Sequence, residues 1–346
     1  MVRSWGGLIS SLLAGQSLSR EDTSWVMREV MRGDATPAQT AGFVVALRAK
    51  GESADEVAGL VDVMLELATP VRVEGRVVDT CGTGGDRSGT VNISTMAALV
   101  VAAAGIPVVK HGGRAASSAS GSADVLEALG VVVDLPATAV GPCLAGAGIA
   151  FCFAPVFHPG MRHAAVPRRE LGIGTVFNIL GPLTNPARPA AQSIGVSEGR
   201  LAPVMAGVLA GRGTDALVFR GDDGLDELTT TTTSRVWTVA GGEVCETAFD
   251  PASLGFARGT LEALRGGTAE DNAKVARRVL AGEAGPVRDA VLLNAAAAIA
   301  AFDAGTGTVE ERLTEALSKA EAALEAGLAA DLLDRWVRVS QELRPV

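Results

Sequence analysis

The segment from Asp79 to Asp86, DTCGTGGD, has a composition that suits phosphate binding. Its glycines, Gly82, Gly84 and Gly85, permit tight turns and expose backbone amides to an anion. The segment NIST, Asn92 to Thr95, follows at the expected start of a helix, where free amides and the helix dipole favour phosphate or a metal-bound oxygen. Neither the P-loop nor the dinucleotide-binding pattern is present. The alternatives are an ordinary turn and an ordinary helix cap.

Two basic segments could bind further anionic groups. The first segment is Lys110 to Ser118. Lys110 and Arg114 offer positive charge, Gly112 and Gly113 permit close backbone approach, and Ser117 and Ser118 add hydroxyl donors. His111 suits a hydrogen-bonding wall better than proton transfer. The second segment, His158 to Arg169, concentrates arginines that could clamp a carboxylate, although arginine pairs are also common on solvated helices. The segment Phe177 to Pro186 is consistent with either a rigid turn lining a pocket or a domain junction.

The loop Gly221 to Glu227, GDDGLDE, gathers four carboxylates after an apolar run. Magnesium prefers one or two carboxylates together with water and substrate phosphates, and the spacing of an EF-hand is absent. The alternative is a solvated acidic turn. Two phosphate-type loops and an acidic loop at one sheet edge would form a phosphoryl-binding site with magnesium.

Composition limits the other possibilities. The chain has 346 residues, 48% of them hydrophobic, which predicts a large globular domain with a smaller one. A net charge of −9 disfavours nucleic-acid binding. The cysteines Cys81, Cys143, Cys152 and Cys245 lack zinc or disulfide spacing, and neither a secretory signal nor a membrane-length apolar run is evident, so we expect a cytoplasmic protein that does not enter membranes.

The elements that must position these loops fall into two groups. The pattern of apolar and capping residues in 1–70 predicts helices that begin after caps at Ser19, Thr36 and Ser53. Pro70 marks a plausible domain boundary. Beyond it, strands and helices alternate, which predicts a mostly parallel sheet covered by helices, with ligands beyond the strand carboxyl ends. The expected strands are 77–79, 106–109, 131–135, 149–153 and 217–220, with a hairpin over 236–245 and an edge strand favoured for 229–233. We expect helices from about Ser94 and Ser122, with Ser122 as a cap, and further helices at the C-terminus.

In this order, the four polar stretches resemble those of anthranilate phosphoribosyltransferases, and the likeness runs from the N-terminal to the C-terminal helices. The resemblance implies a helical domain, residues 1–70 with a segment near 170–190, and an α/β domain, residues 71–346, of the nucleoside phosphorylase and phosphoribosyltransferase type. It also implies transfer of a phosphoribosyl group from phosphoribosyl pyrophosphate to anthranilate. Donor-binding residues would be Gly82, Gly85, Asp86, Thr90, Asn92, Ile93, Ser94, Thr95, Lys110, Ser118 and Ser122.

The resemblance further implies two Mg²⁺ ions per site, one on Ser94 and Glu227 and one on Asp226 and Glu227. The carboxylate of anthranilate would meet Arg168, with the other acceptor-site residues being Gly82, His111, Gly113, His158 and Pro182. Homodimers through the helical part are usual in the family. This chain departs from the family at Gly113, where an asparagine is usual. Another aromatic acceptor therefore stays open, as do a pyrimidine nucleoside phosphorylase and a non-enzymatic nucleic-acid-binding paralogue.

Overall fold

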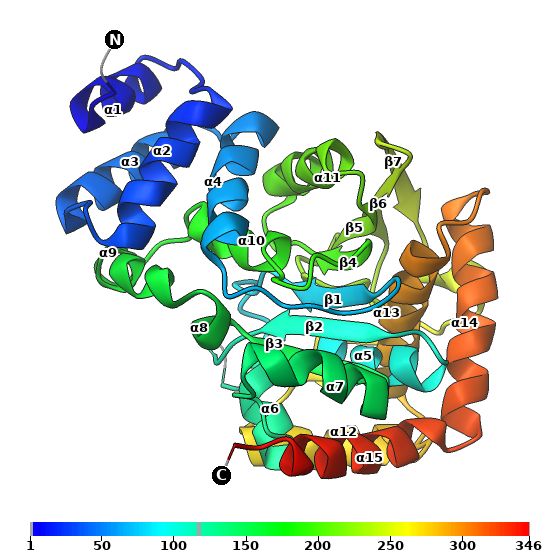
Figure 1. Ribbon diagram of the computed structural model, residues 1–346. Helices are drawn as coiled ribbons and strands as arrows, with labels where there is room; N and C mark the ends of the chain where they lie inside the picture. The colour runs from blue at the N-terminus through cyan, green and yellow to red at the C-terminus, as the bar shows by residue number, and fades with distance from the viewer. Residues whose placement is uncertain (1–2, 116–118, 346) are drawn as a thin grey trace.

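The computed structural model describes residues 3–115 and 119–345. A bundle of N-terminal helices lies beside a larger α/β part built on a seven-stranded sheet (Figure 1). The bundle consists of α1 (Trp5–Leu13), α2 (Arg20–Arg32), α3 (Pro37–Lys50) and α4 (Ala54–Leu67). The predicted N-caps at Ser19, Thr36 and Ser53 are confirmed, and each forms a full capping box. These caps satisfy backbone amides that would otherwise be unpaired at the start of each helix.

The sheet places five parallel strands side by side. Its strands are β1 (Val78–Gly82), β2 (Val108–Gly112), β3 (Ile149–Phe153), β4 (Ala191–Gly195), β5 (Asp215–Gly221), β6 (Ser234–Ala240) and β7 (Glu243–Phe249). Their order is β3-β2-β1-β4-β5-β6-β7. Strands β1 to β5 run parallel to one another, β6 pairs antiparallel with β5, and β6 and β7 form an antiparallel hairpin. The predicted mostly parallel sheet and its hairpin are thus confirmed.

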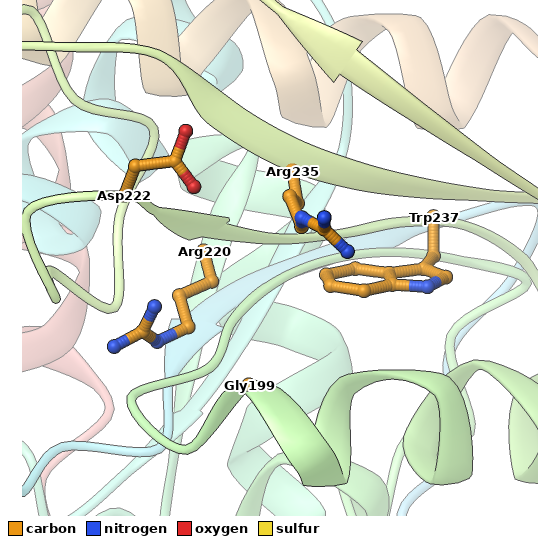
Figure 2. A pocket seen from close by; sticks show the side chains of 5 residues that line it. All are labelled: Gly199, Arg220, Asp222, Arg235 and Trp237. Atoms are coloured by element: carbon orange, nitrogen blue, oxygen red, sulfur yellow. The ribbon is translucent and has the colours of Figure 1, made fainter.

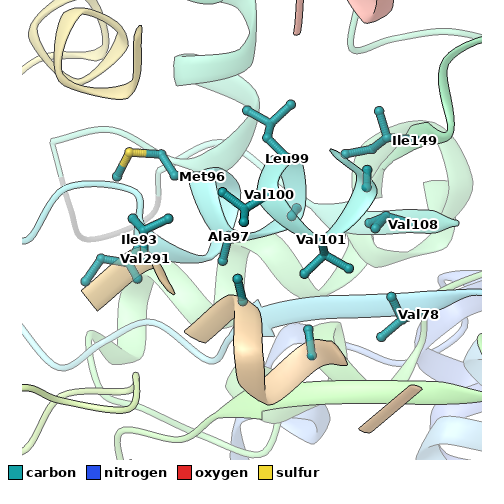
Figure 3. Close-up of a cluster of buried hydrophobic side chains, with 14 of the residues drawn as sticks. Val78, Ile93, Met96, Ala97, Leu99, Val100, Val101, Val108, Ile149 and Val291 are labelled. Carbon is teal, nitrogen blue, oxygen red and sulfur yellow. The ribbon is translucent and has the colours of Figure 1, made fainter. Parts of the chain in front are cut away.

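Helices cover both faces of the sheet. On one face, α5 (Ile93–Ala103) and α13 (Pro286–Asp303) pack on the strands and on each other. Figure 3 shows the apolar side chains of α5, from Ile93 to Val101, lying against Val291 of α13 and against the strands. The remaining elements on this side are α6 (Ser122–Leu129), α7 (Ala137–Ala147), α12 (Ala269–Leu280), α14 (Val309–Glu325), α15 (Leu328–Glu342) and the 3-10 turns η3 (Pro251–Leu254) and η4 (Leu261–Leu264).

The other face is covered by α10 (Phe177–Leu183), α11 (Ala202–Gly211) and α4. Between β3 and α10 the chain forms α8 (Ala154–Phe157), η1 (Pro159–Ala164) and α9 (Ala165–Leu171), and η2 (Gly199–Leu201) precedes α11. The turn η1 packs on α2, and α9 packs on α3. None of the helices in the described ranges combines the length and apolar character needed to span a bilayer. The domain limits given above stay a prediction.

Three local predictions are wrong. Residues 131–135 form no strand, because the Val132 amide donates to Ser340 Oγ on α15 instead of to a neighbouring strand. Residues 229–233 form no edge strand, because Thr229 and Thr231 hydroxyls bond to Asp223. Gly121 rather than Ser122 caps α6, where the Asp124 carboxylate accepts the Gly121 amide.

Candidate active site

The ends of β1 and β2 and the loop that follows β5 line one cleft. Strands β1, β2, β4 and β5 all end on a glycine, namely Gly82, Gly112, Gly195 and Gly221. The cleft of about 550 Å³ lies over β1 and β2 and reaches the loop that follows β5. Because Gly82 pairs with Gly195 in register, the loops after β1 and β4 leave the sheet side by side. The site therefore occupies the place where parallel sheets bind ligands.

Most of the predicted residues line this cleft. From the donor set these are Gly82, Gly85, Asp86, Thr90, Asn92, Ile93, Ser94, Thr95, Lys110 and Ser122, whereas Ser118 lies outside the described residues. From the acceptor set they are Gly82, His111, Gly113, Arg168 and Pro182. From the metal set they are Ser94, Asp226 and Glu227. His158 does not line the cleft; its ring lies 5.2 Å from the His111 ring, centroid to centroid.

The acidic loop contacts the glycine turn directly. The Gly84 amide donates to Asp226 Oδ2 at 2.6 Å, although 142 residues separate the two. A Cβ atom at Gly82 would collide with that same carboxylate, and one at Gly195 would collide with the Asp226 carbonyl. Both strands must therefore end on glycine for the acidic loop to approach the turn so closely.

Two of the four carboxylates of this loop, those of Asp226 and Glu227, are electrostatically strained. Asp226 and Glu227 are each only 8% exposed. Burial raises the pKa of Asp226 to about 7, with a further contribution from the charge of Asp86. Burial, followed by the charge of Asp226, raises the pKa of Glu227 well above its ordinary value. A nearby cation would relieve this cost, so the pair suits a bound divalent metal.

The donor set fits magnesium rather than a metal held by protein alone. Across the described ranges, no group of three or more His, Cys, Asp or Glu side chains could hold a metal ion. Magnesium needs only one or two carboxylates when water and substrate phosphates complete its shell. Asp226, Glu227 and the Ser94 hydroxyl provide such an incomplete oxygen set beside an open cleft.

Lys110 and Asp79 lie beneath the loops and support them. The Lys110 ammonium is 1% exposed and donates to the Thr80 carbonyl at 2.5 Å and to Ser94 Oγ at 3.4 Å. Burial raises the pKa of Asp79 to about 6, and the charge of Lys110 opposes this rise. Asp79 accepts the His111 amide and the Asn185 side-chain amide. The cation of Lys110 therefore contributes positive potential from below the cleft.

Other polar side chains near the cleft are already engaged. Arg114 pairs with Asp124 and Glu127, which neutralises the charge that the sequence suggested for an anion. Asn92 donates to the Ser120 carbonyl and accepts from Asn272, so its side chain ties α5 to neighbouring segments. Both residues line the cleft while bound to protein partners.

Among the described residues that line the cleft are a guanidinium without an ion pair and a neutral histidine. Arg168 has no ion pair within the described part of the chain and lies over the Phe177 ring at 5.8 Å. His111 Nδ1 lies 2.9 Å from the Gly181 carbonyl, so this nitrogen carries the proton and donates. Burial lowers the pKa of His111 to about 3, which keeps the ring uncharged at neutral pH. An aromatic carboxylate would find its countercharge at Arg168 and an uncharged wall at His111.

A second cavity, of about 240 Å³, is separate from this cleft. Figure 2 shows its lining by Gly199, Arg220, Asp222, Arg235 and Trp237. None of the predicted site residues lies there. Arg220 Nε donates to the Ser197 carbonyl, and Ser197 Oγ donates to the Gly84 carbonyl, so the strand that lines this cavity also buttresses the glycine turn.

Sequence reasoning missed residues that shape the cleft without lining it. Gly195 ends β4, a strand that was not predicted because AQSIG contains two polar residues. Gln192 and Ser193 are nonetheless buried, at 1% and 0% exposure. The sequence places Asn185 in a segment interpreted as either a rigid turn or a domain junction. No sequence signal indicates its contact with Asp79.

The contact of Gly195 with Asp226 predicts the effect of a single methyl group. Gly195→Ala should lower stability by about 1–3 kcal/mol and displace the Asp226 peptide, because the added Cβ meets that carbonyl. Urea unfolding and a crystal structure of the variant would measure both effects. Gly211→Ala is the matched control, since nothing lies within 4 Å of its Cβ position. An unmoved Asp226 in Gly195→Ala would contradict this account of the loop.

Comparisons with known proteins agree with this geometry. A family model described as "Glycosyl transferase family, a/b domain" matches residues 74–330, and one described as the helical bundle domain of the same family matches residues 7–68. The anthranilate phosphoribosyltransferase of a Nocardioides species is 61% identical, covering 97% of this chain and 98% of the relative. The anthranilate phosphoribosyltransferase of Saccharopolyspora erythraea is 60% identical, covering 99% of this chain and 98% of the relative.

Solved structures show the same fold. Anthranilate phosphoribosyltransferase from Thermus thermophilus has a TM-score of 0.90 and 44% identity, covering 96% of this chain and 99% of its own. The enzyme from Saccharomyces cerevisiae, in complex with PRPP and Mg, has a TM-score of 0.87 and 27% identity, covering 98% of both chains. With both family models matching and relatives near 60% identity over almost the full length, this chain belongs to the anthranilate phosphoribosyltransferase family.

Proposed function

We propose that this protein transfers the phosphoribosyl group of phosphoribosyl pyrophosphate to anthranilate in tryptophan biosynthesis. The products are N-(5-phosphoribosyl)anthranilate and pyrophosphate. The carrying observation is the hydrogen bond from the Gly84 amide to Asp226, which joins the glycine turn and the acidic loop in one cleft. The names of its relatives, at 61% and 60% identity, support the same reaction.

The donor would bind along the glycine turn and the start of α5. Free amides of the turn and of the α5 N-terminus would meet its phosphates, aided by Ser94 and Thr95 hydroxyls. The complete proposed set is Gly82, Gly85, Asp86, Thr90, Asn92, Ile93, Ser94, Thr95, Lys110, Ser118 and Ser122. A yeast relative solved with PRPP and Mg supports magnesium as the partner of the donor.

Two magnesium ions per site are part of the proposal. Ser94 and Glu227 would hold one ion, and Asp226 with Glu227 the other. When bound, magnesium neutralises negative charge on the pyrophosphate leaving group. The protein's own contribution is to bury Asp226 and Glu227 beside the cleft, so that they bind a cation strongly and remain in place.

Catalysis would depend on charge and positioning rather than on a strong base. The amine nitrogen of anthranilate forms a bond to the anomeric carbon while the carbon–oxygen bond to pyrophosphate breaks, through an oxocarbenium-like state. Arg168 would hold the acceptor carboxylate, and the acceptor site would be completed by Gly82, His111, Gly113, His158 and Pro182. Closure about the segment near Pro70 would exclude water and limit hydrolysis of the donor.

The acceptor could also be a related aminobenzoate. A Cβ at Gly113 would meet nothing within 4 Å, so the missing asparagine side chain leaves open space near the acceptor. Water could fill that space, or a larger aromatic amine could extend into it. Anthranilate remains the favoured acceptor because Arg168 provides a cation for its carboxylate.

We also propose a cytoplasmic homodimer that assembles through the helical part. Leu13 on α1 and Val45 on α3 are 73% and 39% exposed, which supports a protein contact there. A nucleoside phosphorylase is disfavoured because phosphorolysis needs no metal, whereas the buried Asp226 and Glu227 pair suits a bound cation.

Neutralising the acidic pair should abolish the reaction. Asp226→Asn combined with Glu227→Gln should lower kcat with Mg²⁺ by at least ~100-fold, because the leaving group would lose its bound countercharge. Asp222→Asn is the control, since this exposed carboxylate of the same loop lies outside the cleft. Full activity of the double variant would remove the metal assignment, and phosphate-dependent cleavage of thymidine by the parent would favour a phosphorylase.

Arg168 should determine recognition of the acceptor carboxylate. Arg168→Ala should raise KM for anthranilate about 10- to 100-fold while leaving KM for the donor nearly unchanged, because one charged contact is lost. The variant should also lose the parent's preference for anthranilate over aniline, which has no carboxylate. Arg169→Ala controls for charge, as its side chain does not line the cleft. A retained preference in Arg168→Ala would show that another group binds the carboxylate.

A further inference from the structure

One polar side chain stands out in the central helix of the α/β core. Asn294 lies in the middle of α13 and is 1% exposed, while its helical neighbours from Ala290 to Ala301 are buried and otherwise apolar. A side-chain amide in such a position costs free energy unless every donor and acceptor is paired. The partners of Asn294 therefore indicate why it is there.

Asn294 forms three hydrogen bonds, and two of them are to a single residue. The Leu228 amide donates to Asn294 Oδ1, and Asn294 Nδ2 donates to the Leu228 carbonyl, both at 2.9 Å. The second hydrogen of Nδ2 goes to the Ala290 carbonyl, also at 2.9 Å. The amide group thus pairs with both polar backbone atoms of Leu228, as a neighbouring β-strand would do.

Leu228 needs such a partner because its segment is not part of the sheet. Between β5 and β6 the chain forms turns and bends, so no strand fixes this backbone. The Leu228 amide shares a rigid peptide plane with the Glu227 carbonyl. Holding that amide therefore fixes the backbone at Glu227, a buried carboxylate that would gain hydration by turning outward.

We propose that Asn294 is a positioning residue for metal binding: by pairing with Leu228 it holds the Glu227 carboxylate at the cleft. This inference rests on the proposed function. Asp226 is held by the Gly84 amide, so the two acidic residues are fixed by separate contacts. Asn294 itself does not line the cleft, so it would act through Leu228 and Glu227.

The test measures binding rather than turnover. With phosphoribosyl pyrophosphate present and no acceptor, the rise in Tm is followed as Mg²⁺ is added, which gives the Mg²⁺ concentration for half of the rise. Asn294→Leu should increase that concentration at least ~10-fold, as is usual when a residue supporting a metal ligand is lost. In turnover assays kcat should fall, while KM for anthranilate should stay unchanged.

Ser340→Ala is the matched control. Ser340 is fully buried, accepts the Val132 amide and donates to the Val337 carbonyl, yet it does not line the cleft. Its removal should lower the starting Tm and leave the half-maximal Mg²⁺ concentration unchanged. Should Asn294→Leu fail to fold, Asn294→Ala, which also removes both bonds to Leu228, is measured in the same way.

The outcomes separate this inference from the proposed function. A parent that shows the Mg²⁺-dependent rise and an Asn294 variant with an unchanged half-maximal concentration would overturn the positioning role alone. A parent that shows no Mg²⁺-dependent rise would overturn the metal assignment and this inference with it. A shift in the Asn294 variant but not in Ser340→Ala would establish the role.

Discussion

The hydrogen bond between the Gly84 amide and the Asp226 carboxylate is the contact on which the cleft depends. It requires β1, β4 and β5 to be neighbours, with β4 ending on Gly195, so that loops far apart in the sequence leave one edge together. It also brings buried negative charge next to a turn that suits phosphate. The buried carboxylates and a bound phosphate are both negatively charged. They are compatible in one cleft only if cations lie between them, which links the fold to magnesium chemistry.

The cleft wall at Gly181 and Pro182 is also fixed by hydrogen bonds. Residues 181–184 carry four successive carbonyls, and each contacts a side chain from outside that segment. The contacts come from His111, Gln192, Arg212 and His158, at 2.7–2.9 Å. A segment held at every carbonyl has little freedom to shift, so it can present Pro182 to an aromatic ring in a constant position. Two side chains of the sheet, together with Arg212 just after α11 and His158 just after α8, thus fix a segment that lies next to the helical bundle.

Much of this organisation could be predicted from the sequence, for identifiable reasons. Capping residues such as Ser19 act locally, and Gly-rich turns after apolar runs mark strand ends. Strand β4 could not be predicted, because Gln192 is buried only through its bond to the Pro182 carbonyl. Residues 131–135 have a strand-like pattern, but the Val132 amide bonds to Ser340 on α15 instead of to a strand. The role of Asn294 depends on a contact across 66 residues, which no local pattern encodes.

A crystal structure with Mn²⁺ in place of Mg²⁺ and with phosphoribosyl pyrophosphate bound would test the central claim most directly. Anomalous difference density should show metal within about 2.5 Å of carboxylate oxygens of Asp226 or Glu227, with the diphosphate between the metal and the turn at Gly84. Metal and donor bound away from both loops, with these carboxylates unoccupied, would contradict the account.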